Sequence, residues 1–361
     1  MSARPSQPVL SGALNLFMAC VLTYGALYAA YRYGVPDLGG SRDFFKYEEM
    51  IDAPLDWRAV EAPFVLRQLP TLVARGILET GFYYPTVVSF SYFEGFEGPS
   101  TQHRFFALIV SNYLAVLLAL WFGMQEIDRR LGASTRLESK LAFAMLCTGY
   151  FYFSQNVIAP MTEGYGWLGL VLFVIAALHR SVLLVVVACG LLLFSRETAL
   201  VFILPFASVL AYATWTQTRA RRFWVASLVV ATLSILAVVA IRSSGWVSGN
   251  PQQIAMGGFV GHVAEILPHS GLLFPVVVAQ LELALILGIL ALRARAEAFA
   301  ALLGLGALLL VGAAAGLSTN LGRILGEPVP ALALLAILGA ASLGGAYPKD
   351  ESAVSRASSP G

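Results

Sequence analysis

The chain has 361 residues, of which 58% are apolar and only 12% are charged. Soluble domains are about half apolar and about a quarter charged, so this composition is typical of a membrane protein with several spans. The formal net charge of +2 is too small to indicate a nucleic-acid partner. The cysteines Cys20, Cys147 and Cys189 lie in apolar runs and lack the spacing of a disulfide framework or a metal site.

Apolar runs recur along the whole chain, and each is long enough, or nearly so, to cross about 30 Å of hydrocarbon. The first run follows a short basic start and has no clear cleavage site, so we expect an uncleaved helix. The predicted spans are 9–31, 104–124, 141–158, 164–179, 181–195, 199–216, 223–242, 274–292, 298–316 and 329–346.

Runs 164–179 and 181–195 are short, and they can be interpreted as one span or as two. Two spans keep Arg180 out of the membrane and leave most basic residues of the short loops on one side, as expected for the cytoplasmic side. We therefore predict an all-α polytopic protein with about ten transmembrane helices and both termini in the cytoplasm. Residues 1–346 form one transmembrane domain. The Ser-, Pro- and Gly-rich tail, 347–361, is predicted to be disordered.

The loop 32–103 is then extracytoplasmic, and it holds many of the chain's 21 acidic residues. Ser41 precedes an acidic, aromatic stretch, which is typical of a capped helix start. After Pro63, apolar residues recur at helical spacing and predict a second short helix, which Pro70 is expected to kink. A polar, aromatic loop of this length suits the cap of an active site.

Two stretches of this loop and one mid-chain stretch carry a family resemblance. They read Asp43-Phe-Phe-Lys-Tyr47, Ala62-Pro-Phe-Val-Leu-Arg67-Gln-Leu-Pro70 and Ser195-Arg-Glu-Thr-Ala-Leu200. Together they resemble the GT-C superfamily of integral-membrane glycosyltransferases, most closely its mannosyltransferase-like branch. The resemblance implies a polyprenyl-phosphate-linked sugar as donor, a lipid or glycan acceptor, and a site at the extracytoplasmic face. It also favours the inner (plasma) membrane of a bacterium.

The resemblance assigns Asp43 the role of catalytic base. Inverting glycosyl transfer needs a carboxylate that takes the acceptor proton. The alternative is that Asp43 is a helix-start acid near Ser41, stabilised by the helix dipole. Many members of the superfamily carry paired acids in the first loop, whereas this chain has one, so a requirement for a divalent cation stays open. Glu163, in a turn facing the same compartment, is a candidate second carboxylate or an ordinary turn residue.

Arginine suits the donor phosphate because its planar fork binds phosphate oxygens in pairs. Arg67, Arg196 and Arg323 are all predicted at the outer face, against the usual charge bias. The alternative is that each pairs with a neighbouring acid, such as Arg196 with Glu197 or Arg323 with Glu327.

Three further residues complete the substrate-binding candidates. Glu282 lies inside a predicted span, where an acid is costly and indicates function. Tyr47 suits sugar stacking, and it suits the aromatic belt at a membrane surface equally well. Glu197 follows Arg196 in the mid-chain motif.

The expected function is transfer of a sugar from a polyprenyl-phosphate donor. The alternatives are a transporter or flippase of a lipid-linked glycan, or a scaffold with the same fold and no catalysis. The absence of internal repeats weighs against a transporter.

Overall fold

The structure is a computed structural model. It describes residues 7–33, 41–58, 60, 64–81, 99–131, 133–149, 162–214, 218–243 and 326–343. Within these ranges every regular element is a helix and none is a strand, which confirms the all-α prediction.

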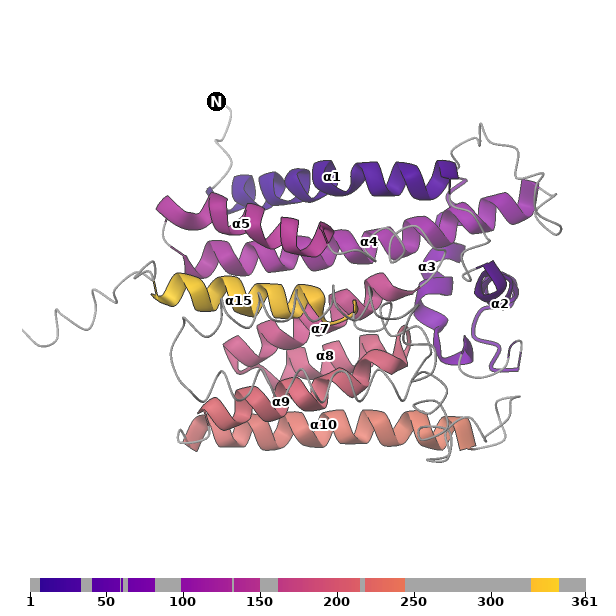
Figure 1. Cartoon of the computed structure of the whole chain (residues 1–361). Coiled ribbons are helices and arrows are strands. Elements are labelled where there is room, and N and C mark those ends of the chain that lie inside the picture. Colours follow the sequence, from indigo (N-terminus) through magenta and orange to yellow (C-terminus); the bar gives the residue numbers. More distant parts are fainter. Residues whose placement is uncertain are drawn as a thin grey trace, which may run out of the picture.

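The longer helices pack side by side, and two short helices sit at one end of the bundle (Figure 1). Each predicted span that is wholly or largely described overlaps one helix. The span 141–158 is described only over 141–149, and the spans 274–292 and 298–316 lie outside the described residues. The bundle helices are α1 (Gln7–Tyr33), α4 (Pro99–Arg130), α5 (Ala133–Thr148), α7 (Glu163–His179), α8 (Val182–Leu193), α9 (Leu200–Thr214), α10 (Thr218–Ser243) and α15 (Val329–Leu343).

Among the described residues, 2 helices are long and apolar enough to cross a membrane, namely Thr101–Arg130 within α4 and Ala220–Ile241 within α10. Helices α5, α7, α8, α9 and α15 are shorter, with 12 to 17 residues each. Helix α8 has 12 residues, which at 1.5 Å per residue span about 18 Å, less than the hydrocarbon thickness. A count of about ten spans therefore stays a prediction.

The stretch 164–195 forms two helices because the chain turns at Arg180. Arg180 ends α7 in the left-handed conformation, with φ 54°. The amide of Ser181 donates to the carbonyl of Ala176 over 2.9 Å, which closes the helix end. Ser181 then caps α8 by accepting from the amide of Leu184. The break predicted at Arg180 is confirmed.

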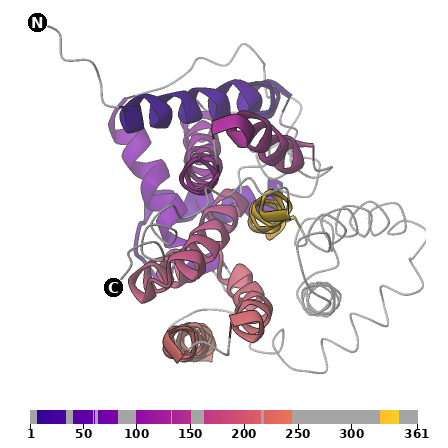
Figure 2. The ribbon, with the colours of Figure 1, turned by 90° about the vertical axis from the view of Figure 1, so that its left-hand side faces the viewer.

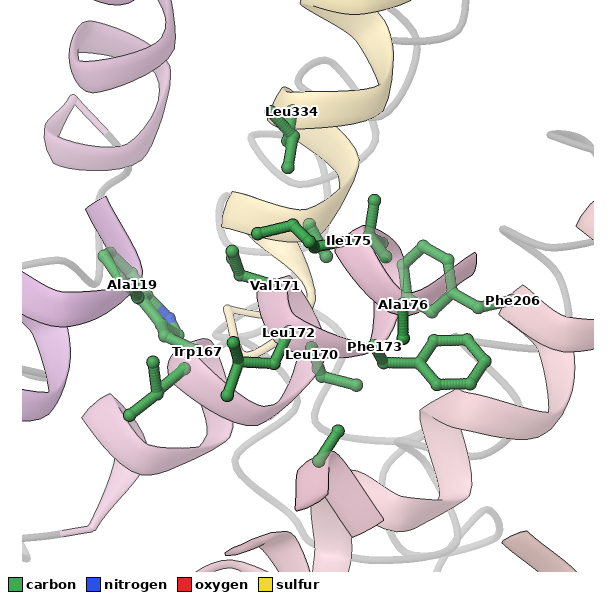
Figure 3. Close-up of a cluster of buried hydrophobic side chains, with 14 of the residues drawn as sticks. Ala119, Trp167, Leu170, Val171, Leu172, Phe173, Ile175, Ala176, Phe206 and Leu334 are labelled. Atoms are coloured by element: carbon green, nitrogen blue, oxygen red, sulfur yellow. The ribbon is translucent and has the colours of Figure 1, made fainter. Parts of the chain in front are cut away.

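Helix α7 forms the centre of the bundle, because the side chains of residues 163–176 are buried on every side. Figure 3 shows Trp167, Phe173 and neighbouring aliphatic side chains of α7 packed against α4, α9 and α15. The indole nitrogen of Trp167 donates to the carbonyl of Gly326 over 3.0 Å, which fixes the start of α15. Helix α15, drawn in yellow, lies beside α5 and α7 (Figure 2).

Two central helices, α4 and α7, run in the same direction. Helices α4 and α7 meet at Asn112 and Gly164 near one end, and at Glu126 and His179 near the other. The first of these ends carries the two short helices. The second carries a run of basic residues at the ends of α4, α5 and α10: Arg129, Arg130, Arg136, Lys140, Arg221 and Arg222.

The short helices form a cap, which we define as α2 (Ser41–Asp52), the 3-10 turn η1 (Phe64–Leu66) and α3 (Gln68–Glu79). The helix start predicted at Ser41 is confirmed. The second predicted helix is broken at Arg67, and Pro70 lies in the first turn of α3, where a missing amide hydrogen costs nothing. The expected kink at Pro70 is therefore wrong.

The cap has its own hydrophobic core against the end of α4. Phe44 packs edge-on against Phe105, with ring centroids 5.2 Å apart. Met50, Leu66 and Leu108 are fully buried in the same cluster. Side chains from α1 and α10 complete it, so the cap is fastened to the bundle by packing as well as by polar contacts.

Candidate functional site

A network of buried charges lies where the cap meets the bundle. Arg67, at the break between η1 and α3, points its Nε toward Glu197 Oε2 at 3.3 Å. Its Nη1 donates to the hydroxyl oxygen of Tyr47 on α2. The guanidinium group also lies over the ring of Phe64, 5.2 Å from its centroid. One arginine therefore joins α2 and α3 to η2 (Glu197–Ala199), the turn before α9.

Arg196 forms the second half of the network. Its Nε donates to Glu327 Oε1 over 2.6 Å, and its Nη2 lies 3.2 Å from Glu163 Oε1. Glu163 is the first residue of α7, and Glu327 lies in the turn that precedes α15. Arg196 therefore ties the ends of three bundle helices together directly beneath the cap. We call Tyr47, Arg67, Glu163, Arg196, Glu197 and Glu327 the cap-end network.

Backbone geometry explains why acids collect here. Glu163 and Glu197 begin helical segments, where the helix dipole and the free amides favour negative charge. Glu163 Oε2 accepts from the amide of Thr162 over 3.0 Å. The amide of Leu69 donates to the carbonyl of Phe194 over 2.8 Å, which brings the start of α3 against the segment that carries Arg196.

Burial makes the network strongly coupled. Arg67 is 4% exposed and Arg196 3% exposed. Burial alone lowers the pKa of Arg67, but Tyr47, Glu197 and Glu163 raise it by more, so its pKa lies above the ordinary value. Burial likewise lowers the pKa of Arg196, while Glu163 and Glu327 raise it and prevail. Both arginines therefore stay charged over the whole working pH range.

Each guanidinium group uses two of its three nitrogens in the contacts described above. Arg67 engages its partners through Nε and Nη1, and Arg196 through Nε and Nη2. A guanidinium group has five N–H donors in a fork. Three carboxylates face the two arginines, so an added anion would have to displace one of them.

A belt of polar side chains on α4 supports the network. Asn112 Oδ1 accepts from the amide of Gly164 over 2.7 Å, and Ser111 donates to the carbonyl of Pro70 over 2.9 Å. Ser111 also lies 2.8 Å from the hydroxyl of Tyr165. The hydroxyl of Thr162 is buried beside Glu163 without a hydrogen bond to any residue of the described part of the chain.

Most of the candidates selected from the sequence meet in the cap-end network. Tyr47, Arg67, Glu163, Arg196 and Glu197 come from distant parts of the chain and lie in one connected group. The backbone of Asp43 lies in the first turn of α2, but its side chain falls outside the described residues. Glu282 and Arg323 also fall outside them. The catalytic and binding roles of all these residues stay predictions.

The pairing differs from the one that the sequence suggests. Arg196 binds Glu163 and Glu327, while its neighbour Glu197 binds Arg67. Successive residues of a helical turn point in different directions, so neighbours in sequence do not face each other. Glu327 is therefore a member that sequence reasoning assigned to another partner. One sequence feature could have predicted this role for Glu327. It is an acid directly before an apolar run, at the same end of the bundle as Arg196.

A second polar cluster lies at the opposite end of α4. Asp128 accepts from Ser11 and Asn15 of α1, both over 2.7 Å, and its other oxygen lies 3.0 Å from Lys140 of α5. Glu126 is buried and binds Arg130 and His179. These contacts join α1, α4, α5 and α7 far from the cap.

In the described ranges, no group of three or more His, Cys, Asp and Glu side chains is placed to hold a metal ion. The side chain of Asp43 and the whole of Glu282 lie outside that description. The chain matches no protein-family model, no curated protein and no solved structure. The fold and the site alone define the class of protein. It is a helical bundle with a folded cap, and a buried ion-pair network lies between the bundle and the cap.

Proposed function

We propose that this protein is a membrane glycosyltransferase that takes its sugar from a polyprenyl-phosphate donor at the extracytoplasmic face. The observation that carries the proposal is the convergence of Tyr47, Arg67, Glu163, Arg196 and Glu197 in one buried group beneath α2. These residues were singled out from separate motifs and turns. The network reaches α2 through Tyr47, one helical turn after Asp43, which supports one common site.

The surface of the bundle supports the membrane setting. Large apolar side chains stay exposed along the outer sides of α1, α8 and α10. On α10 they recur at helical spacing, at Val225, Val229, Leu233, Leu236 and Val239. Extended apolar surface of this kind is costly in water and suits contact with lipid chains. We propose an integral membrane protein with about ten spans, cytoplasmic termini and a bacterial plasma-membrane location.

In the proposed reaction, the carboxylate of Asp43 takes the proton from an acceptor hydroxyl. The acceptor oxygen attacks the anomeric carbon, and the bond from that carbon to the phosphate oxygen breaks. Polyprenyl phosphate leaves with the electron pair. Arg67 and Arg196 supply fixed positive charge near the leaving phosphate, and such preorganised charge stabilises a developing anion.

The test is a transfer assay on membranes that contain the full-length protein, with a panel of polyprenyl-phosphate hexoses and pentoses carrying a radioactive sugar. We expect the wild type to transfer label to a lipid or glycan product. We expect Asp43→Asn to lower the rate by ~100-fold or more while the protein level is unchanged, because a general base contributes about 10²–10⁴. Full activity in Asp43→Asn would remove Asp43 from the mechanism.

A non-catalytic scaffold is the second candidate, and one observation favours it. Both buried arginines already have carboxylate partners, which is what a purely structural clasp between cap and bundle requires. This candidate predicts no transfer from any donor of the panel. Movement of a lipid-linked glycan across proteoliposomes without a covalent product would instead favour a flippase.

A further inference from the structure

Tyr47 connects α2 to the cap-end network through a buried polar contact. Its side chain is 0% exposed. The ring packs edge-on against Phe64, with centroids 5.7 Å apart. Its hydroxyl oxygen accepts a hydrogen bond from Nη1 of Arg67. Hydrogen bonds from a charged donor are about twice as strong as neutral ones and set a direction as well as an energy.

Arg67 is itself held from the bundle side. Its Nε lies 3.3 Å from Glu197 Oε2, and both side chains are almost fully buried. The amide of Leu69, two residues further on, is bound to the carbonyl of Phe194. The segment between α8 and α9 therefore sets the position of the Arg67 guanidinium group. The hydrogen bond from this group to Tyr47 in turn restrains α2.

Two other sets of contacts constrain α2 differently. Phe44, Met50 and Ile51 are buried in the cap core, and apolar packing is not directional. Arg104 binds Glu48 at 3.5 Å and Asp52 at 2.8 Å, but these side chains are partly exposed, so the pairs are weak and screened by solvent. The bond from Arg67 is thus a buried directional restraint on the rotation of α2.

Asp43 precedes Tyr47 by four residues, which is about one turn of α2. We propose that Tyr47 is a positioning residue: held by Arg67, it fixes the rotation and height of α2 and thereby the place of Asp43. This inference rests on the proposed function, in which Asp43 is the base. Tyr47 does not contact substrate in this scheme, in contrast to the sugar-stacking role that the sequence suggests.

The test is Tyr47→Phe in the full-length protein, which removes the hydroxyl and keeps the ring. We expect kcat to fall about 10- to 100-fold with the KM for the polyprenyl-phosphate sugar unchanged, because misplacing a reacting group by about 1 Å costs about 100-fold. The matched control is Tyr113→Phe. Tyr113 lies on α4 and is 7% exposed. Its hydroxyl forms a hydrogen bond of 2.8 Å with Thr23 of α1, away from α2. This control is expected to keep the wild-type kcat.

Hydrogen–deuterium exchange gives a readout that needs no activity. In Tyr47→Phe, we expect faster exchange of the backbone amides in α2 and unchanged exchange in α7. Wild-type kcat in Tyr47→Phe, a raised KM with kcat unchanged, or an equal loss in Tyr113→Phe would each overturn the inference.

The two proposals fail in different ways. If the wild type transfers no sugar, the proposed function fails and this inference falls with it. If the wild type is active and Asp43→Asn is inactive, but Tyr47→Phe equals the wild type, only the positioning role is lost.

Discussion

Arg196 is the residue on which the cap-end network depends most, because it is bound to two buried carboxylates. Glu163 and Glu327 are both 0% exposed. A buried ion pair contributes little net stability compared with apolar packing, but removing one partner leaves the other charge buried and uncompensated. The cost of losing Arg196 should therefore exceed what its own contacts contribute.

Arg196→Gln tests this at the residue scale. We expect it to lower the free energy of unfolding by ~3–5 kcal/mol, since breaking a buried pair typically costs that much. The measurement is thermal or denaturant unfolding of the detergent-solubilised protein. Arg75→Gln is the control, because Arg75 pairs with Glu79 on an exposed face of α3 at 2.9 Å and such pairs contribute about 0–1 kcal/mol. Equal stabilities of the two variants would show that the network is not structural.

At the scale of elements, α7 packs closely because it carries small residues where its neighbours approach. A Cβ at Gly164 would meet the carbonyl oxygen of Asn112 at 2.4 Å and Val116 at 2.9 Å. The backbone oxygen cannot move without shifting α4. Small residues at helix contacts permit this close approach between α4 and α7, and the approach in turn places Glu163 under the cap.

Gly164→Ala should therefore be destabilising although alanine favours helices. We expect a loss of ~1–3 kcal/mol, the usual cost of overpacking, seen as a lower unfolding temperature. Gly190→Ala on α8 is the matched substitution, because its Cβ would meet nothing within 4 Å. That variant should be neutral or stabilised by up to about 1 kcal/mol through helix propensity. The idea is wrong if Gly164→Ala is the more stable of the two.

Helices were the easiest elements to predict from the sequence, because apolar runs and capping residues are local signals. Ser41 marks the start of α2, and Arg180 marks the break between α7 and α8. Contacts between distant segments leave no such signal. The pairing of Arg196 with Glu327, across 131 positions, depends on how α8 and α15 are placed by packing. Sequence reasoning found most members of the network but not their partners.

At the scale of the whole molecule, charge is segregated along the bundle. The end opposite the cap carries Arg129, Arg130, Arg136, Lys140, Arg221 and Arg222, and two of the acids at this end, Glu126 and Asp128, are paired within the fold. Short cytoplasmic loops carry an excess of Lys and Arg in membrane proteins. This distribution supports the proposed orientation, with the cap outside the cell.

Cysteine labelling decides that orientation. In a variant with Cys20, Cys147 and Cys189 replaced by alanine, single cysteines are introduced at two exposed positions, Glu49 on α2 and Arg222 near the start of α10. A membrane-impermeant maleimide added to intact cells should label Glu49→Cys and spare Arg222→Cys, and both should be labelled after lysis. Since the end of α10 packs on the cap core through Val238 and Ile241, its start lies at the far end of the bundle.

Labelling of Arg222→Cys alone in intact cells would invert the orientation, and equal labelling of both would show that the bundle does not separate two compartments. Either result would remove the extracytoplasmic site on which the transferase proposal depends.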